Sequence, residues 1–252
     1  MTSAPRVAIL HIGKTGGTWL RNTLQPFYRH EEICPLQFEE QFPQDLGALS
    51  QYRLFDAHLS HAAASRLDAA LVTVLRNPYD RIISLYHYWR EAPKTSAGPA
   101  VAKRLTFDGF LSAIDNEYVI RDVMNAQSWQ IAFGHQLTYR RQFQHISPDE
   151  LFGQAVENLD RFAAVGVTED MPTLAGMIRS HLGMAIDTAL ERMNVTRQRP
   201  RLSQTSLALR EKIHQHVSVD LALYHHVLEK FVFPYRISRP AESDIPVEST
   251  VA

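Results

Sequence analysis

The sequence has almost no cysteine, no long hydrophobic run and almost no net charge. Its one cysteine, Cys34, excludes a framework of internal disulfides and is typical of a protein from a reducing compartment. No apolar run approaches the roughly 18 to 20 residues that span a bilayer, so we expect no transmembrane segment. The formal net charge of −1 provides no general attraction to nucleic acid, and we expect no nucleic-acid partner.

The length and composition fit a globular chain with a substantial core. Hydrophobic residues make up 45% of the 252 positions and charged residues 21%, which is ordinary for a soluble protein. Residues 1–5 do not resemble a signal peptide. The segment after about residue 239 is rich in proline, serine and acidic residues, so we expect a flexible C-terminal tail over 240–252.

A strand, a glycine-rich turn and a helix start follow one another near the N-terminus. Residues 7–10 are an apolar run suited to a buried strand, residues 13–18 read Gly-Lys-Thr-Gly-Gly-Thr, and a helical pattern begins at Trp19. Glycines let the backbone approach an anion, and first-turn N–H groups have no partner inside their helix. Lys14 adds a mobile charge, and the two threonines add hydroxyl donors. The segment therefore predicts a phosphate-binding loop rather than an ordinary strand-to-helix turn.

This loop differs from the Walker A loop of nucleotide kinases, G-x-x-x-x-G-K-[ST]. Residues 13–15 match the end of that pattern, but its first glycine would fall at Ala8. The glycines here come after the lysine instead. An ATP-dependent kinase that uses the same loop remains the alternative function.

A second strand, loop and helix follow at residues 70–89. Residues 70–75 are apolar throughout, as in a parallel strand covered on both faces. Arg76 comes at the carboxyl end of this strand, where open α/β sheets bind ligands. An arginine grips a phosphate through two parallel hydrogen bonds, and Pro78 suits the first turn of the helix. The pattern predicts a second anion contact.

Both loops resemble those of sulfotransferases that use 3′-phosphoadenosine 5′-phosphosulfate (PAPS). Residues 11–18 resemble the 5′-phosphosulfate loop His-Ile-Pro-Lys-Thr-Gly-Gly-Thr of the carbohydrate sulfotransferases, a group that includes heparan-sulfate 2-O-sulfotransferase, with Gly13 in place of proline. Residues 76–84 resemble the 3′-phosphate motif of this family, Arg-x-Pro-x-x-Arg followed by a serine. The resemblance implies one α/β domain over residues 1–239, with a central parallel β-sheet flanked by helices, related to P-loop nucleotide kinases.

The resemblance also implies the reaction and the residues that carry it. The sulfuryl group of PAPS would pass to a hydroxyl of a saccharide or glycolipid, with adenosine 3′,5′-bisphosphate (PAP) as the other product and no metal required. A cytoplasmic bacterial protein is expected, unless a membrane anchor has been removed. The oligomeric state stays open. The cofactor-binding residues implied by the resemblance are Lys14, Thr15, Gly16, Gly17, Thr18, Trp19, Arg76, Ser84, Thr196, Arg197 and Arg199, and Lys14 is also catalytic.

His58 is the favoured general base. Residues 56–59 resemble a Gly-His-aliphatic segment of the family, with Ala57 in place of glycine, whose histidine is the base in the 2-O-sulfotransferase. An imidazole with a pKa near 6.5 is suited to removing a proton from an attacking hydroxyl. His61 and Asp56 remain rivals, and geometry must decide between the three.

A further segment resembles the acceptor side of the family. Residues 125–134 are similar to Asn-x-Gln-Thr-Arg-x-Leu-x-Gly, but Ser128 and Trp129 replace the Thr-Arg pair. Arg140 and Arg141 could restore positive charge there or form a solvated turn. Because of these two replacements and Ala57, a catalytically silent nucleotide-binding relative remains a third hypothesis.

The rest of the chain is expected to be mainly helical. Residues 91–104 contain two prolines and a glycine and are expected to form an exposed loop. A Ser-Pro-Asp-Glu start at residue 147 predicts a helix to about residue 160. The other expected elements are helices over 61–69, 107–114, 116–134, up to about 182 and over 217–231, and a strand over 162–168.

Overall fold

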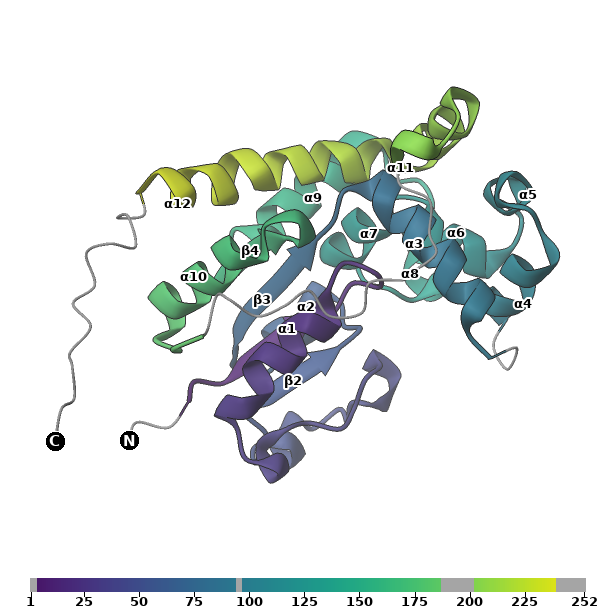
Figure 1. Cartoon of the computed structure of the whole chain (residues 1–252). Helices are drawn as coiled ribbons and strands as arrows, with labels where there is room; N and C mark the ends of the chain where they lie inside the picture. Colours follow the sequence, from purple (N-terminus) through teal and green to yellow (C-terminus); the bar gives the residue numbers. More distant parts are fainter. Residues whose placement is uncertain (1–3, 94–96, 187–201, 239–252) are drawn as a thin grey trace, which may run out of the picture.

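A four-stranded parallel sheet lies at the centre of the computed structural model, which describes residues 4–93, 97–186 and 202–238 (Figure 1). The strand order is β2-β1-β3-β4, and every neighbouring pair is parallel. The predicted α/β domain with a central parallel sheet is therefore confirmed, and the predicted strands over 7–10 and 70–75 have the predicted bounds. The strands are β1 (Val7–Leu10), β2 (Leu54–Ala57), β3 (Ala70–Leu75) and β4 (Ala164–Val167).

Alternate strand residues enter two separate cores because successive side chains of a strand point to opposite faces. Ala8 and Leu10 of β1 belong to one core, where α7, α9 and α11 cover the sheet. Val7 and Ile9 belong to the other, where α1 and α10 cover it. Figure 1 shows α1 and α10 in front of the sheet. These helices are α1 (Gly17–Leu24), α7 (Ala126–Ala132), α9 (Pro148–Leu159), α10 (Met171–Leu182) and α11 (Leu207–Val227).

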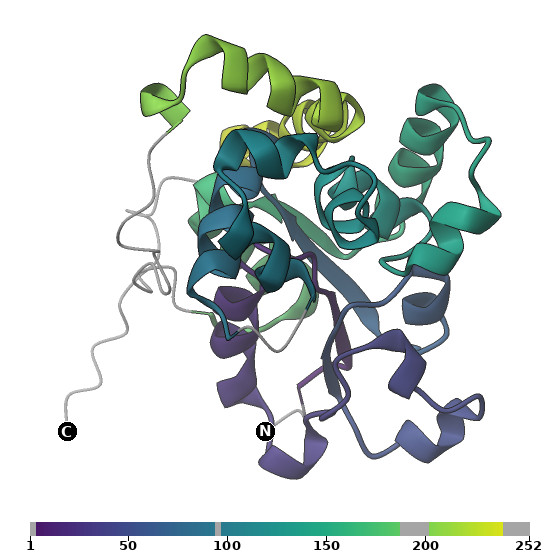
Figure 2. The ribbon, with the colours of Figure 1, turned by 90° about the vertical axis from the view of Figure 1, so that its right-hand side faces the viewer.

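A third apolar cluster joins the helices that lie beyond one end of the sheet. Four consecutive helices pack together there and against the first half of α11, and Figure 2 turns this group toward the viewer. Within the described ranges, no helix is long and apolar enough to cross a membrane. The four are α3 (Pro78–Glu91), α4 (Ala97–Arg104), α5 (Phe107–Ser112) and α6 (Glu117–Val123).

The remaining elements are short. Residues 25–49, where prolines and a glycine break any periodicity, form four short 3₁₀ turns and two isolated bridges, to Leu54 and His58. The other helices are α2 (His61–Ser65), α8 (Leu137–Gln142), α12 (Phe233–Ser238), the 3₁₀ turns Gln25–Phe27, His30–Glu32, Glu39–Gln41, Leu46–Leu49, Thr168–Asp170 and Leu202–Gln204, and the π-helix Leu228–Val232.

The prediction of an exposed loop over residues 91–104 is wrong for its second half, which forms α4. The small residues that suggested a loop are the ones that let α4 pack closely. Gly98 is buried against the Trp89 ring, and a Cβ on it would lie 2.7 Å from that ring. Pro99 lies in the first helical turn, where its missing N–H breaks no helix hydrogen bond.

The predicted single helix over 116–134 is broken in two at Asn125. This residue has a left-handed backbone, with φ 46°, and its side-chain oxygen accepts hydrogen bonds from the N–H groups of Val219, at 3.0 Å, and Asp220, at 3.1 Å. Helix α11 is interrupted at Val217, where φ is −129° and ψ is 20°. The interruption leaves those N–H groups without acceptors inside the helix. Asn125 therefore caps the second half of α11.

Asp220 caps the start of α7 in return. Its buried carboxylate accepts from the N–H of Gln127 at 3.2 Å, the N–H of Ser128 at 2.7 Å and the Ser128 hydroxyl at 2.8 Å. Burial raises the pKa of Asp220, while Arg81 and these donors oppose the rise. Two interrupted helices, far apart in sequence, thus satisfy each other's N–H groups.

Replacing Asn125 tests this reciprocal cap. We expect Asn125→Ala to lower the free energy of unfolding by roughly 2 to 4 kcal/mol, because it removes a cap and puts an ordinary side chain in a left-handed backbone. Asn125→Gly removes the same cap without the backbone strain, and we expect a smaller loss of roughly 1 to 2 kcal/mol. Urea denaturation measures both. Equal stability of Asn125→Ala and the parent would contradict the assignment.

Candidate functional site

Two loops meet where β1 and β3 end. From β1 the chain passes to β2 on one side and then returns to β3 on the other, so these carboxyl ends form the switch point at which open α/β sheets bind ligands. Arg76, after β3, donates from Nη1 to the carbonyl oxygen of Lys14 at 3.2 Å, across 62 positions of sequence. Arg81 donates from Nη1 to the carbonyl oxygen of Gly13, also at 3.2 Å. The structure thus brings both predicted anion-binding motifs together.

The loop after β1 has a fixed and unusual backbone. Lys14 and Gly16 both have positive φ, 69° and 99°. The buried Thr15 hydroxyl donates to the carbonyl oxygen of Ile12 at 2.9 Å, which holds the turn closed. The Thr168 hydroxyl, from the segment after β4, donates to the Thr15 carbonyl oxygen. The side chain of Thr15 therefore stabilises the loop itself.

The N-terminus of α1 has neither a side-chain cap nor an acidic residue. Its cap residue, Gly16, offers no side-chain acceptor, and no acidic residue lies in its first turn. By contrast, α3 and α9 are capped by Asn77 and Ser147 and have acids in their first turns. The first-turn N–H groups of α1 belong to Gly17, Thr18 and Trp19, and the helix dipole adds partial positive charge there. Thr18 is exposed, whereas the Trp19 ring is buried in the core.

The backbone of Arg76 is clamped by a buried amide. Gln127 accepts from the Arg76 N–H at 2.9 Å and donates to the Arg76 carbonyl oxygen at 3.0 Å. Next along the chain, the N–H of Asn77 donates to Glu169 at 3.1 Å. Ser84 lies two turns farther along α3 and is buried. The guanidinium therefore extends from a rigid strand end toward the first loop.

His58 lies against the start of the first loop. Its Nδ1 is 2.6 Å from the carbonyl oxygen of His11, which also accepts from Gln130 at 2.8 Å. Because a carbonyl can only accept, Nδ1 carries the hydrogen and Nε2 carries the lone pair. The ring stacks between Phe38 and His135, with centroid distances of 5.5 and 5.3 Å. Burial, followed by the neighbouring histidines His11 and His135, lowers the pKa of His58 to about 4.

Asp56, a rival for the role of general base, pairs with His11 and lies near Arg21. One carboxylate oxygen is 2.8 Å from Nδ1 of His11, and the other is 3.8 Å from Nε of Arg21. Asp56 is itself buried. One oxygen therefore orients the His11 imidazole and the other faces Arg21. The geometry supports Asp56 less well than His58 as the general base.

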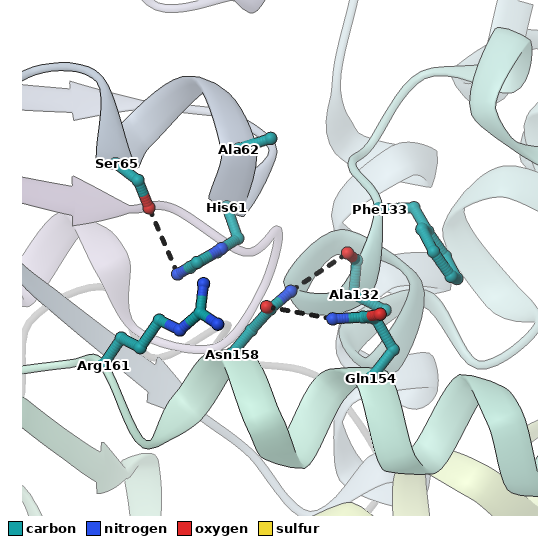
Figure 3. A pocket seen from close by; sticks show the side chains of 8 residues that line it. All are labelled: His61, Ala62, Ser65, Ala132, Phe133, Gln154, Asn158 and Arg161. Atoms are coloured by element: carbon teal, nitrogen blue, oxygen red, sulfur yellow. Dashed lines mark hydrogen bonds between the residues drawn. The ribbon is translucent and has the colours of Figure 1, made fainter.

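His61 lines a separate pocket (Figure 3). Its Nε2 is 3.2 Å from the Ser65 hydroxyl on the next turn of α2. Burial, and then the charge of Arg161, lower its pKa. The lining of this pocket includes neither His58 nor any residue of the loop after β1, so the geometry supports His61 less well than His58 as the general base. The pocket is lined by His61, Ala62, Ser65, Ala132, Phe133, Gln154, Asn158 and Arg161.

The sulfotransferase domain family matches residues 5–147, more than half of the chain. The chain belongs to this family. It is a PAPS-dependent sulfotransferase.

Two solved sulfotransferase structures are similar to the chain. One, from Alicyclobacillus acidocaldarius, is 18% identical with a TM-score of 0.48, and the alignment covers 92% of this chain and 98% of that one. The other, mouse sulfotransferase SULT7A1 complexed with PAP, is 14% identical with a TM-score of 0.42, over 92% of this chain and 87% of that one. No curated protein sequence matches the chain.

Arg140, from α8, lies against the residue that replaces the arginine of the family segment. Trp129 occupies the position where the resemblance predicts an arginine, and the Arg140 guanidinium lies over its ring, 4.8 Å from the centroid. Arg140 donates to the carbonyl oxygens of Met124, at 2.6 Å, and Arg121, at 3.1 Å. Burial lowers the pKa of Arg140 to about 10, so it stays charged at neutral pH. Arg140 is therefore no part of a solvated turn, whereas Arg141 is exposed.

Sequence reasoning missed the residues that position the site. His11, Gln127, Gln130 and Thr168 each contact a loop or a predicted site residue. His11 lies inside the first loop motif, and Gln127 and Gln130 lie inside the segment 125–134, but the contacts that these residues make are created by the fold. Three predicted cofactor-binding residues lie outside the described residues: Thr196, Arg197 and Arg199.

Two glycines of the loop offer a matched test. A Cβ on Gly17 would lie 2.6 Å from the His11 ring, whereas a Cβ on Gly13 meets nothing within 4 Å. We expect Gly17→Ala to weaken PAP binding about five- to 150-fold, the equivalent of the roughly 1 to 3 kcal/mol that overpacking costs. Gly13→Ala should bind PAP within about twofold of the parent. Isothermal titration calorimetry measures both, and equal affinities would show that the loop tolerates displacement of His11.

Proposed function

We propose that this sulfotransferase transfers the sulfuryl group of PAPS to a hydroxyl of a saccharide or glycolipid, with His58 as general base. The observation that carries the proposal is the hydrogen bond from Arg76 to the Lys14 carbonyl. It joins two cationic loops beside a helix N-terminus that has neither a side-chain cap nor an acid. Such a cluster of donors suits a ligand with two separate phosphate groups.

Each predicted residue has a role in holding the donor. Lys14, the N–H groups of Gly17, Thr18 and Trp19, and the open turn at Gly16 would bind the 5′-phosphosulfate. Arg76 and Ser84 would bind the 3′-phosphate. Thr15 would act by closing the loop through its bond to Ile12. Thr196, Arg197 and Arg199 stay predictions for the same ligand.

The chemistry follows from where charge develops. Bound PAPS supplies the sulfuryl group and a phosphate that leaves. Lys14 and the first-turn N–H groups of α1 stabilise negative charge at that phosphate without needing to reorganise. Nε2 of His58 accepts the proton of the acceptor hydroxyl, because the His11 carbonyl keeps the hydrogen of the ring on Nδ1. We propose no metal for this chemistry.

The choice of a sugar hydroxyl as acceptor rests on the motif rather than on the fold. Residues 11–18 follow the carbohydrate-sulfotransferase form of the loop. The kinase alternative requires a Walker turn, but Ala8 is a buried residue of β1, and the strand continues to Leu10. The chain therefore has no room for a longer turn before Lys14. A silent relative would bind PAP but turn over no acceptor.

Substitution of Lys14 and Arg76 tests donor binding. We expect Arg76→Ala to weaken PAP binding about 10- to 150-fold, since each hydrogen bond to a charged group contributes roughly 1.5 to 3 kcal/mol. We expect Lys14→Ala to lower turnover about 10²- to 10³-fold, as loss of one charge-stabilising donor does elsewhere. Calorimetry with PAP, and product formation from PAPS across a panel of saccharides, measure the two effects.

Two controls make this test decisive. Lys14→Ala leaves the strain at this left-handed position unchanged, because both residues carry a Cβ. ATP with Mg²⁺ is titrated beside PAP without metal. Binding of Mg-ATP alone would support the kinase, and normal PAP affinity and turnover in both variants would exclude the proposed roles.

The role of His58 predicts a distinctive pH dependence. A base must be neutral to accept a proton, and a pKa of about 4 keeps His58 neutral above that pH. We therefore expect kcat/KM to show no fall from this group between pH 8 and pH 5, whereas an unperturbed histidine would cause a fall near 6.5. His58→Gln should lower kcat about 10²- to 10⁴-fold and leave PAP affinity within about twofold. His61→Gln, in the separate pocket, is the matched control. Loss of turnover in His61→Gln alone would reverse the assignment.

A further inference from the structure

The ammonium group of Lys14 lies on an aromatic ring. Its Nζ is 3.8 Å from the ring centroid of Tyr88. A cation this close to the face of a ring is attracted by the negative charge of the π system. Tyr88 belongs to α3 and is 49% exposed, whereas its neighbour Trp89 is buried in the core. The ring of Tyr88 is therefore placed against the lysine without being needed to fill the interior.

The backbone beneath the lysine is held independently of this contact. Lys14 has φ 69°, and its carbonyl oxygen accepts the hydrogen bond from Arg76. Its flexible side chain can therefore move while the loop stays fixed. Tyr88 lies four residues after Ser84, so both occupy the same face of α3, with Tyr88 one turn farther from Arg76. The ammonium can therefore leave the ring without any rearrangement of the loop backbone.

We propose that Tyr88 is a positioning residue that holds the Lys14 ammonium in a resting place when no donor is bound. This inference rests on the proposed role of Lys14 in binding the phosphosulfate. A phosphate attracts the ammonium more strongly than a half-exposed ring does, so ligand binding draws the lysine away from Tyr88. Because the ring contact must be given up, Tyr88 reduces the affinity of the site for its nucleotide.

Replacing the ring should therefore strengthen nucleotide binding. In calorimetric titration with PAP, we expect Tyr88→Leu to bind about two- to fivefold more tightly than the parent, the factor that corresponds to an exposed cation–π contact. Tyr88→Phe keeps the ring face and should restore parent affinity. Tyr118, which carries Arg121 over its ring instead, provides the control variant Tyr118→Leu, whose PAP affinity should match the parent. Thermal unfolding checks that each variant is folded.

A double-mutant cycle separates this mechanism from a direct contact between Tyr88 and the nucleotide. In the Lys14→Ala background, Tyr88→Leu should leave PAP affinity unchanged, because no ammonium remains to be held. A direct contact would instead give the same effect in both backgrounds. Weaker or equal binding by Tyr88→Leu in the parent background, or an equal gain in both backgrounds, overturns the proposal.

The same titration distinguishes the failure of this inference from the failure of the proposed function. If the parent chain does not bind PAP, the proposed donor site is wrong, and the proposed role of Tyr88 is wrong with it. If the parent binds PAP and Tyr88→Leu binds it no more tightly, the donor site stands and only the role of Tyr88 is lost.

Discussion

The hydrogen bond between Arg76 and the Lys14 carbonyl is the contact on which the site depends, and it constrains the whole sheet. It can form only if β1 and β3 are parallel neighbours that end at the same edge, which the pairing of Val7 with Ala70 and Ile9 with Val72 provides. Both strands are apolar except for Thr73, whose hydroxyl donates to the Leu10 carbonyl oxygen, as suits strands with helices on both faces. The burial that holds the sheet together is thus also what places the Arg76 guanidinium against the loop that carries Lys14.

A second set of contacts ties this edge to the helices beyond it. Arg81 is fully enclosed, and it donates to the Gly13 carbonyl on one side and to the Asp122 carbonyl on the other. Burial lowers its pKa, while Asp220 and then Asp122 oppose that effect. Asp220 in turn caps the helix that carries Gln127, which clamps Arg76. A buried charge is tolerable only where it is paired and hydrogen-bonded, so this network fixes the relative positions of the loop and its surroundings.

The parts that could be predicted from the sequence are those whose signals are local. The strand over 70–75 is a single apolar run, and the helix from Pro148 begins with a capping box between Ser147 and Glu150. The break at Asn125 and the helix α4 were not predicted, because both depend on contacts with other parts of the chain. Asn125 takes a left-handed backbone to cap a segment more than 90 positions away, and α4 forms because Gly98 fits against Trp89. Among the site residues, the loop and Arg76 follow from local patterns, whereas the contact between Gln127 and Arg76 exists only in the folded chain.

Burial of His58, the proposed base, affects proton transfer in two opposite ways. A histidine with a pKa of about 4 is a weaker base than a free imidazole, so it gives less driving force for taking a proton from a hydroxyl. The same burial keeps it neutral at every physiological pH and fixes its tautomer through the His11 carbonyl. The hydroxyl itself becomes more acidic as its oxygen bonds to sulfur, so a weak base that is already oriented can serve late in the reaction. In the proposed mechanism, most of the stabilisation must then come from Lys14 and the uncapped end of α1, the groups that we assign to the leaving phosphate.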